Sequence, residues 1–396
     1  MNDRVQQVVH AIGQVAGNPP AALHEPDIGD DEQRLVRDCL RSTFVSSVGE
    51  YVDRFEEEIA RLTGCPHAVA TVNGTAALHL ALVGLGIGPG DEVIVPGISF
   101  IATANAVFHA GAVPHFVDVE AGHLSMDAAK LRRYLRDICG PEESGGCRNR
   151  HTGRRIAAMI PVHVFGHVAH MPALMDVAAE FGLTVLEDAA EALGSTRYGK
   201  SAGSFGECGI FSFNGNKIIT CGGGGMIVTG NSALARRLKH LSTTAKIPHP
   251  WRYEHDMTAF NYRLPNLNAA LGVAQLRRLD AFVSAKRALF ARYRQALAGI
   301  EGVRLMAEPD GARSNYWLQA LVLDDPHDPD MDDLLEALNT QGYGARPLWS
   351  PLHLQRHCRD CPRMPDMSVA EDMARRVLNP PSSAHLVQLH TRDGRT

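Results

Sequence analysis

The stretch FSFNGNKIITCGGGGMIVT, residues 211–229, decides the fold and the chemistry that we expect of this chain. Its two apolar ends have the composition of β-strands. The residues between them are too few for a helical crossover, so we expect the strands to pair antiparallel. Lys217 lies in the connection, among asparagines, isoleucines and glycines, with no acidic residue at helical spacing to pair with it. Because an amine in such surroundings loses hydration, the stretch indicates a site that needs one lysine and a close approach of the backbone.

Outside this stretch, short runs rich in β-branched residues alternate with segments of helical periodicity. Leu78, Ala81, Leu82 and Leu85, for example, form one apolar stripe at helical spacing. Strands that alternate with helices predict an α/β fold, with a mainly parallel sheet covered by helices on both faces. The seven strands that we predict are Ala68–Val72, Glu92–Val95, Pro114–Val119, Ile156–Val162, Leu183–Leu186, Gly209–Phe213 and Met226–Thr229.

The last third of the chain predicts a smaller α+β unit. A long helical region begins near Asn266 and continues past Arg294, with apolar residues along one side. We therefore expect a large domain over residues 1–255, and a linking helix with a small domain over residues 256–396. The N-terminal segment is expected to pack on the small domain. The elements predicted for the small domain are a strand at Tyr316–Leu323, a helix at Met331–Asn339 and a return strand at Gly344–Pro347.

Composition narrows the class of protein. The 396 residues are 45% apolar and 21% charged, which is ordinary for a globular enzyme, and the net charge of −5 gives no electrostatic basis for nucleic-acid binding. The first residues lack a basic segment followed by an apolar run, and no apolar stretch is long enough to span a membrane. Eight scattered cysteines suit a reducing cytoplasm better than a disulfide scaffold, and we expect Gly140–Arg155 to be a surface loop.

Polar residues gather where the predicted strands end. Ligands bind beyond the carboxyl ends of the strands in parallel α/β sheets, so residues that follow several strands meet at one edge. This convergence indicates a binding site more strongly than any single residue does. The residues are Gly74 and Thr75 after the first strand, Phe100 after the second, His163 after the fourth, Asp188 and Glu191 after the fifth, Ser212 at the end of the sixth and Lys217 after it.

Most of these residues also have a structural explanation when each is taken alone. Lys217 is the exception, since neither a turn nor a core position explains its amine. The structural explanations are a tight turn for Gly74 and Thr75, a backbone-bonded hydroxyl for Ser212, a helix N-cap for Asp188, a core position for Phe100 and a satisfied strand-end histidine for His163.

Two other motifs are set aside. The glycine-rich run from Gly84 to Gly90 ends a helix and leads into a strand, whereas a dinucleotide-binding loop follows a strand and opens a helix. We therefore do not expect a nucleotide-dependent dehydrogenase. Cys358 and Cys361 form a C-x-x-C motif without a second pair at zinc spacing, so we expect no metal site.

A phosphate-binding turn, an aromatic plate, a buried acid and a lysine together match pyridoxal phosphate. The helix N-terminus at Gly74 and Thr75 suits the phosphate, and Phe100 suits the flat ring. An acid such as Asp188 keeps the ring nitrogen protonated, and a lysine such as Lys217 forms a Schiff base with the aldehyde. The sequence therefore predicts a pyridoxal-phosphate enzyme in which Lys217 holds the cofactor.

Eight stretches of the chain together match one known family. They are VSSVGEYVDRFEEEIA, VNGTAALHLAL, GDEVIVPGISFIATANAV, IPVHVFGH, EDAAEALGS, FSFNGNKIITCGGGGMIVT, FNYRLPNLNAALGVAQL and RPLWSPLHLQ, spread from about residue 25 to 385. Their combination resembles the DegT/DnrJ/StrS family of nucleotide-sugar aminotransferases, which implies the type I fold of pyridoxal-phosphate transferases. The chain most resembles the branch acting on 4-keto-6-deoxy-N-acetylhexosamine nucleotides, as in bacillosamine and legionaminic acid pathways.

The resemblance implies a role for each site residue. Lys217 would be the Schiff-base lysine, Asp188 would pair with the pyridine nitrogen, and Glu191 would lie near the ring hydroxyl, where glutamine is often found. Asn261 resembles an asparagine that reaches the phosphate from the other subunit, which implies a homodimer. The remaining implied contacts are Phe100 on the ring, Gly74, Thr75 and Ser212 on the phosphate, and His163, Arg263, Arg346, Trp349 and His353 on the substrate.

The implied reaction moves an amino group from an amino acid, expected to be glutamate, to C4 of a nucleotide-linked keto-sugar. Members of the family with histidine at the position of Lys217 catalyse dehydration, so the lysine favours transamination. Two alternatives stay open. One is a 3-aminotransferase or dehydratase acting on another nucleotide-linked keto-sugar, and the other is a catalytically silent regulator on the same fold. Retention of Lys217, Asp188 and the phosphate-binding turn argues against the regulator.

Overall fold

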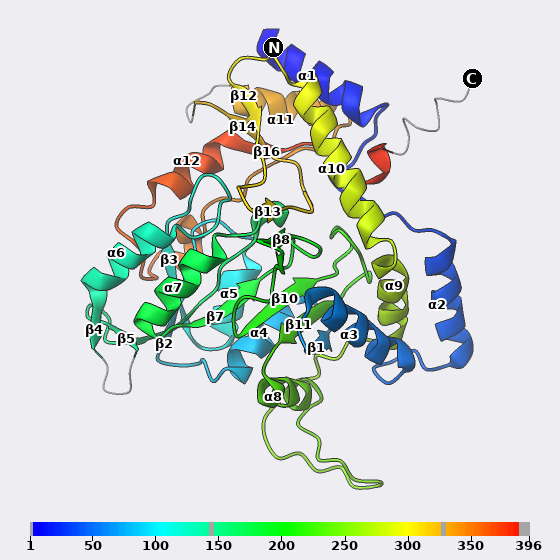
Figure 1. Ribbon diagram of the computed structural model, residues 1–396, viewed down its shortest axis with the longest axis vertical. Helices are drawn as coiled ribbons and strands as arrows, with labels where there is room; N and C mark the ends of the chain where they lie inside the picture. Colours follow the sequence, from blue (N-terminus) through cyan, green and yellow to red (C-terminus); the bar gives the residue numbers. More distant parts are fainter. Residues whose placement is uncertain (1–2, 142–145, 326–329, 388–396) are drawn as a thin grey trace.

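The computed structural model describes residues 3–141, 146–325 and 330–387, and a mainly parallel sheet lies at its centre (Figure 1). The main strands are β1 His67–Thr71, β2 Asp91–Pro96, β3 Val113–Val117, β6 Arg155–Met159, β7 Thr184–Asp188, β10 Cys208–Ser212 and β11 Gly225–Thr229. They lie in the order β1-β11-β10-β7-β6-β2-β3. The strands from β10 to β3 are parallel, and β11 runs antiparallel to both of its neighbours, which confirms the predicted pairing across the Lys217 connection.

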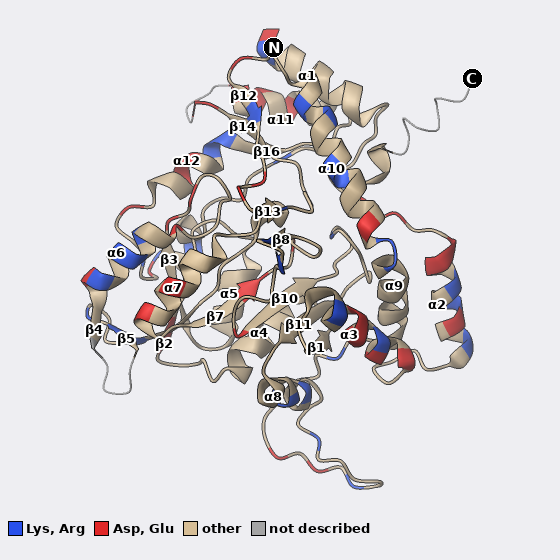
Figure 2. Ribbon diagram, viewed as in Figure 1, with Lys and Arg blue, Asp and Glu red and all other residues tan. Residues whose placement is uncertain are grey.

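Helices cover the sheet because its strands are apolar on both faces. The helices of this part are α2 Asp30–Ser42, α3 Glu50–Thr63, α4 Gly74–Gly84, α5 Ala102–His109, α6 Ala128–Ile138, α7 Met171–Phe181, α8 Ser232–Ser242 and α9 Asn266–Leu276. All of β2 is buried, as expected for a strand covered on both sides. α4 packs against β10 and β11, and α3 packs against β1. Figure 2 shows acidic and basic residues side by side on α2 and α3, where they form ion pairs at helical spacing.

The chain between α6 and β6 differs from the predicted surface loop. β4 (Cys139–Pro141) and β5 (Cys147–Asn149) form an antiparallel hairpin, and β5 pairs with β6, which extends the sheet to nine strands. A disulfide joins Cys139 to Cys147, so these two cysteines depart from the thiols expected of a reducing compartment.

Buried polar contacts explain why the loop prediction is wrong over the described part of residues 140–155. The Asn149 side chain donates a hydrogen bond of 2.9 Å to the Glu92 carboxylate, which lies fully buried in the sheet. Such a partner, 57 residues away along the chain, cannot be inferred from local composition. Residues 142–145 lie outside the described part.

The C-terminal part is a smaller α+β unit, as predicted. Its elements are α10 Leu279–Ala296, β12 Val303–Leu305, β14 Leu321–Leu323, α11 Asp330–Thr340, β15 Arg346–Pro347, α12 Ser368–Arg376 and β16 Val377–Asn379. The strands form a sheet in the order β12-β14-β16-β15. The strand predicted at Tyr316–Leu323 is wrong at its start, because Tyr316 has a left-handed backbone (φ 48°) and only β14 is extended.

The first helix of the chain, α1 (Asp3–Ala16), packs on this C-terminal unit. Val5, Val8 and Ile12 are fully buried in an apolar cluster with residues of α10 and α11. A strap, residues 17–29, then leads from α1 along the C-terminal unit to α2. Backbone hydrogen bonds hold the strap, including one from Ser382 N to Leu23 O at 2.7 Å.

A third, three-stranded sheet is formed by β8 (Thr196–Arg197), β9 (Lys200–Ser201) and β13 (Ala312–Arg313). β13 pairs with β8, so this small sheet ties the segment before β14 to the large part of the chain. Within the described residues, no helix combines the length and the apolar character that crossing a membrane requires.

Candidate active site

A cavity of about 740 Å³ lies at the carboxyl ends of the parallel strands β7 and β10. Residues at the strand ends and Leu23 of the strap form part of the cavity wall. Residues of the C-terminal unit, such as Trp317 and Leu348, close the other side. The predicted site residues that the structure brings together there are Gly74, Thr75, Phe100, Asp188, Glu191, Ser212, Lys217, Arg346 and Trp349.

The N-terminus of α4 and the end of β10 form one end of the cavity. Asn73 caps the helix, with its side chain accepting a hydrogen bond of 2.8 Å from Ala76 N. The first-turn amides of Gly74 and Thr75 have no intrahelical acceptor and lie at the cavity. Gly74 also lies so close to Ser212 that a Cβ there would be 2.9 Å from the serine Cβ. Together they form a cradle that suits a phosphate.

Replacing Gly74 with alanine is expected to weaken pyridoxal phosphate binding about tenfold, because the added Cβ displaces Ser212 from the cradle. Alanine is otherwise favoured over glycine inside a helix, so the loss would not come from a poorer helix. Titration of the cofactor-free protein with pyridoxal phosphate measures the effect. Gly230→Ala, which adds a Cβ in open space, is the control, and equal affinities in the two variants would contradict the cradle.

Asp188 ends β7 at the floor of the cavity and is 5% exposed. Its Oδ2 accepts a hydrogen bond of 2.7 Å from Thr103 Oγ1, which in turn lies 2.7 Å from Ser99 Oγ. Burial raises the pKa of the Asp188 carboxyl, although the hydrogen bonds from Thr103 and Ala190 act in the opposite direction. A buried carboxyl of this kind gains from a cationic partner, as the protonated nitrogen of a pyridine ring would be.

Glu191 and Lys217 form an ion pair in the cavity. Lys217 Nζ donates to Glu191 Oε1 at 3.2 Å, and Glu191 Oε2 accepts a hydrogen bond of 2.9 Å from Phe165 N. Phe165 has a left-handed backbone (φ 55°) inside the short 3-10 helix Val164–Gly166, which aims its N–H at the carboxylate. Burial raises the pKa of Glu191, while the charge of Lys217 lowers it.

Trp317 also lines the cavity, although the sequence does not predict it as a site residue. Its indole Nε1 donates a hydrogen bond of 2.6 Å to Asn216 O, and its ring lies under Lys217 Nζ, 4.0 Å from the ring centroid. It falls in the predicted strand Tyr316–Leu323, where a tryptophan is typical of the core. No local signal distinguishes it, because the polar Ser-Asn pair precedes Tyr316 and lies outside that strand.

Two of the predicted substrate residues are buried away from the cavity. His163 Nδ1 accepts a hydrogen bond from Ala169 N at 3.2 Å, which leaves Nε2 to donate to Glu187 Oε2 at 3.0 Å. His353 pairs with Glu371 at 3.0 Å and is 2% exposed. Neither histidine is among the residues that line the cavity.

Asn261 and Arg263 lie at the base of an arm, residues 243–262, that extends away from the body below α8 in Figure 1. Asn261 is exposed, and its side-chain oxygen accepts a hydrogen bond of 3.0 Å from Arg263 Nε. Neither residue lines the cavity of its own chain. Trp251 and Tyr253, further along the arm, are 76% and 81% exposed.

The residues of the cavity fit pyridoxal phosphate. The cradle at Gly74 and Ser212 would hold the phosphate, Asp188 would face the ring nitrogen, and Lys217 would bind the aldehyde carbon. When bound, the cofactor supplies a carbonyl group that condenses with amines and a ring that withdraws electrons. Fold and site together define a pyridoxal-phosphate-dependent aminotransferase of the type I fold.

Comparison with known proteins assigns the chain more closely. The model of the DegT/DnrJ/EryC1/StrS aminotransferase family matches residues 26–392, and the chain belongs to this family. GDP-perosamine synthase of Caulobacter vibrioides is 37% identical over 373 residues, covering 93% of this chain and 95% of the relative. The spore coat polysaccharide biosynthesis protein SpsC of Bacillus subtilis is 35% identical over 309 residues, covering 76% and 75%.

A solved structure of an aminotransferase has the same fold as this chain. The structure of DesV from S. venezuelae superimposes with a TM-score of 0.79 at 32% identity, covering 91% of this chain and 92% of that one. The predicted fold class is therefore confirmed, and the chain is a pyridoxal-phosphate-dependent nucleotide-sugar aminotransferase.

Proposed function

We propose that this enzyme transfers an amino group from L-glutamate to C4 of a nucleotide-linked 4-keto-6-deoxy-N-acetylhexosamine. The observation that carries the proposal is the Lys217 amine, held beside Glu191 in a cavity whose floor is Asp188. A relative named GDP-perosamine synthase supports a nucleotide sugar that carries an amine. The N-acetylhexosamine rests on the resemblance of the sequence to the bacillosamine and legionaminic acid branch.

Each residue of the site has its own role in the proposed reaction. Lys217 Nζ would take a proton from the Cα of the amino donor and deliver protons to the product side, since it is the amine nearest the reacting atoms. Glu191 Oε1, at 3.2 Å, orients that amine by accepting its hydrogen bond. Asp188 would hold the proton on the ring nitrogen, and Phe100 would shield one face of the ring from water.

Arg346 and Trp349 are proposed to bind the nucleotide sugar at the mouth of the cavity. Arg346 Nη1 donates to Asn339 Oδ1 at 3.1 Å and to Ala345 O at 2.8 Å, which fixes the guanidinium. A guanidinium has five N–H groups in a planar fork, so the N–H groups of Arg346 that are not used in these two bonds can bind a diphosphate. The Trp349 and Phe100 rings, 6.4 Å apart, form an apolar wall that suits a deoxysugar.

The substrate proposal predicts which nucleotide sugars are aminated. UDP-, GDP- and dTDP-linked 4-keto-6-deoxy sugars, with and without an N-acetyl group, and their 3-keto isomers are incubated with glutamate and read by mass spectrometry. We expect amination of a 4-keto N-acetyl sugar. Amination confined to 3-keto sugars would favour the 3-aminotransferase alternative. Loss of water without amination would favour the dehydratase alternative. No reaction with any of these sugars would contradict the proposal.

We also propose a homodimer with shared active sites, because the exposed arm carries Asn261 away from the cavity of its own chain. Mixing an inactive Lys217→Ala chain with an impaired Asn261→Ala chain should restore part of the activity. A hybrid dimer contains one site with both residues intact. The measured quantity is turnover after the two variants are dissociated and reassociated together. A fully active monomer at the assay concentration would contradict sharing.

A further inference from the structure

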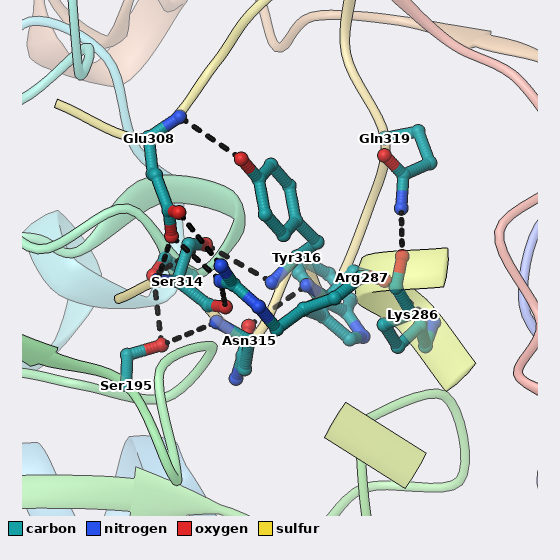
Figure 3. A network of polar contacts seen from close by, with 10 residues as sticks. Ser195, Lys286, Arg287, Glu308, Ser314, Asn315, Tyr316 and Gln319 are labelled. Carbon is teal, nitrogen blue, oxygen red and sulfur yellow. Dashed lines mark hydrogen bonds and ion pairs between the residues drawn. The ribbon is translucent and has the colours of Figure 1, made fainter. Parts of the chain in front are cut away.

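One wall of the cavity is a short segment of the C-terminal unit, residues 314–319, that buried hydrogen bonds hold in place (Figure 3). Asn315 Nδ2 donates to the carbonyl oxygens of Glu191 and Leu193, both at 2.9 Å. Asn315 N donates to Ser195 Oγ at 2.9 Å. These contacts fasten the segment to the turn that carries the active-site glutamate.

A partly exposed ion pair holds the start of the segment. Arg287, on α10, donates to Glu308 Oε2 at 2.7 Å and to Ser314 O at 2.9 Å. Ser314 N donates to the same carboxylate oxygen at 2.6 Å. Figure 3 shows these groups meeting between α10 and the segment, so the helix fixes the path of the chain just before Trp317.

Lys286, the residue before Arg287 on α10, holds the other end. It is fully buried, and its amine donates hydrogen bonds to Trp317 O, at 2.8 Å, and to Ser382 O. Burial lowers the pKa of this amine well below its ordinary value. Burying a lysine amine whose acceptors are two backbone carbonyls costs desolvation free energy. No role in the proposed reaction accounts for this lysine.

Trp317 lies between these anchors and contacts both Lys217 and the residue before it. Its N–H holds the carbonyl of Asn216, the residue that precedes Lys217, and its ring face lies 4.0 Å from Lys217 Nζ. The side chain is 3% exposed, so it has little freedom to move. The backbone next to the lysine and the amine at its tip are therefore both held by one indole.

We propose that Trp317 is a positioning residue for Lys217 and that Lys286 sets the position of Trp317 through its carbonyl oxygen. Transamination requires the Lys217 amine to be released while substrate is bound, and a free lysine side chain has many rotamers. The indole face attracts the ammonium form, and the Asn216 contact fixes the backbone from which the lysine extends. The proposal concerns the lysine alone and does not depend on which sugar is the substrate.

The test uses Trp317→Phe, which keeps a ring face without the N–H, and Trp317→Leu, which loses both. In the cofactor-free protein, the rate at which a brief pulse of acetic anhydride acetylates Lys217 is measured by peptide mass spectrometry against exposed Lys200. We expect this rate to rise several-fold in Trp317→Leu and less in Trp317→Phe. Tyr293→Phe, which removes a buried hydrogen bond to Pro381 O away from Trp317, should leave the rate unchanged.

Steady-state kinetics separate positioning from ligand contact. We expect kcat to fall in the order Trp317→Phe, then Trp317→Leu, with a smaller change in KM for the nucleotide sugar. An unchanged Lys217 acetylation rate in Trp317→Leu would overturn the proposal. A rise in KM with an unchanged kcat would overturn it as well.

The role of Lys286 has its own matched pair of variants. Lys286→Met removes the amine that holds Trp317, whereas Tyr293→Phe removes a neighbouring buried hydrogen bond of 2.8 Å to Pro381 that does not reach Trp317. We expect both variants to melt at lower temperature, but only Lys286→Met to raise the acetylation rate of Lys217 and lower kcat. Equal effects of the two variants would overturn the link from Lys286. If Lys286→Met does not fold, Lys286→Leu supplies the same comparison, because it also removes the donor to Trp317 O.

Discussion

Replacing Lys217 with alanine is expected to lower kcat by at least about 10³-fold, because the variant loses the amine that binds the cofactor and the group that moves protons. The variant should still bind pyridoxal phosphate through the cradle at Gly74 and Ser212. It should lack the visible absorption of the lysine-linked cofactor, and borohydride should no longer fix the cofactor to the protein. Absorption spectra before and after reduction measure both effects.

Lys200→Ala is the control, because Lys200 is exposed and its amine lies over the ring of Phe205, far from the linkage chemistry. It should behave as the parent enzyme does. Peptide mapping after borohydride reduction identifies the linked residue directly. A cofactor found on any lysine other than Lys217 would contradict the assignment, whatever the activity of the alanine variant.

Replacing Asp188 with asparagine is expected to lower kcat by about 10²–10⁴-fold while the cofactor still binds. The amide has nearly the shape of the carboxyl and can still accept the hydrogen bond from Thr103, but it carries no charge to keep the ring nitrogen protonated. Turnover and cofactor affinity, measured separately, distinguish the two effects. Near-normal turnover in this variant would refute the role.

The cofactor-free protein gives a second, independent test of Asp188. Burial raises the pKa of its carboxyl in the folded state, so folding favours the protonated form and the stability associated with this group is lost as pH rises from the unfolded pKa, about 3.9, through the raised one. Without cofactor, Asp188→Asn should therefore melt at higher temperature than the parent at pH 7. The difference should shrink below about pH 4. A lower melting temperature at pH 7 would contradict this account.

The sequence predicts the parts of the site that depend on sheet geometry. Gly74, Asp188 and Lys217 each follow a strand, and parallel strands bring their carboxyl ends to one edge whatever the details of packing. The antiparallel pairing of β10 with β11 follows in the same way from the short connection.

The parts of the site that the sequence does not predict depend on partners far apart in the chain. Trp317 reaches the cavity because Lys286, Arg287 and Asn315 hold an irregular segment there, and none of these contacts has a local pattern. His163 directly follows the predicted strand Ile156–Val162, but β6 ends at Met159 and the His163 ring contacts Glu187, 24 residues later, so position alone does not tell which way a side chain faces.

The packing of α1 has a consequence for the order in which the chain is made. Val5, Val8 and Ile12 are made long before α10, on which they pack and which begins at Leu279. At about 5–20 residues per second, this apolar face waits for on the order of tens of seconds before its partner exists. During that interval the apolar face of α1 is exposed on the growing chain. The packing of α1 on the C-terminal unit therefore forms only after α10 has been made, and a truncated product lacking the C-terminal unit should be prone to aggregate.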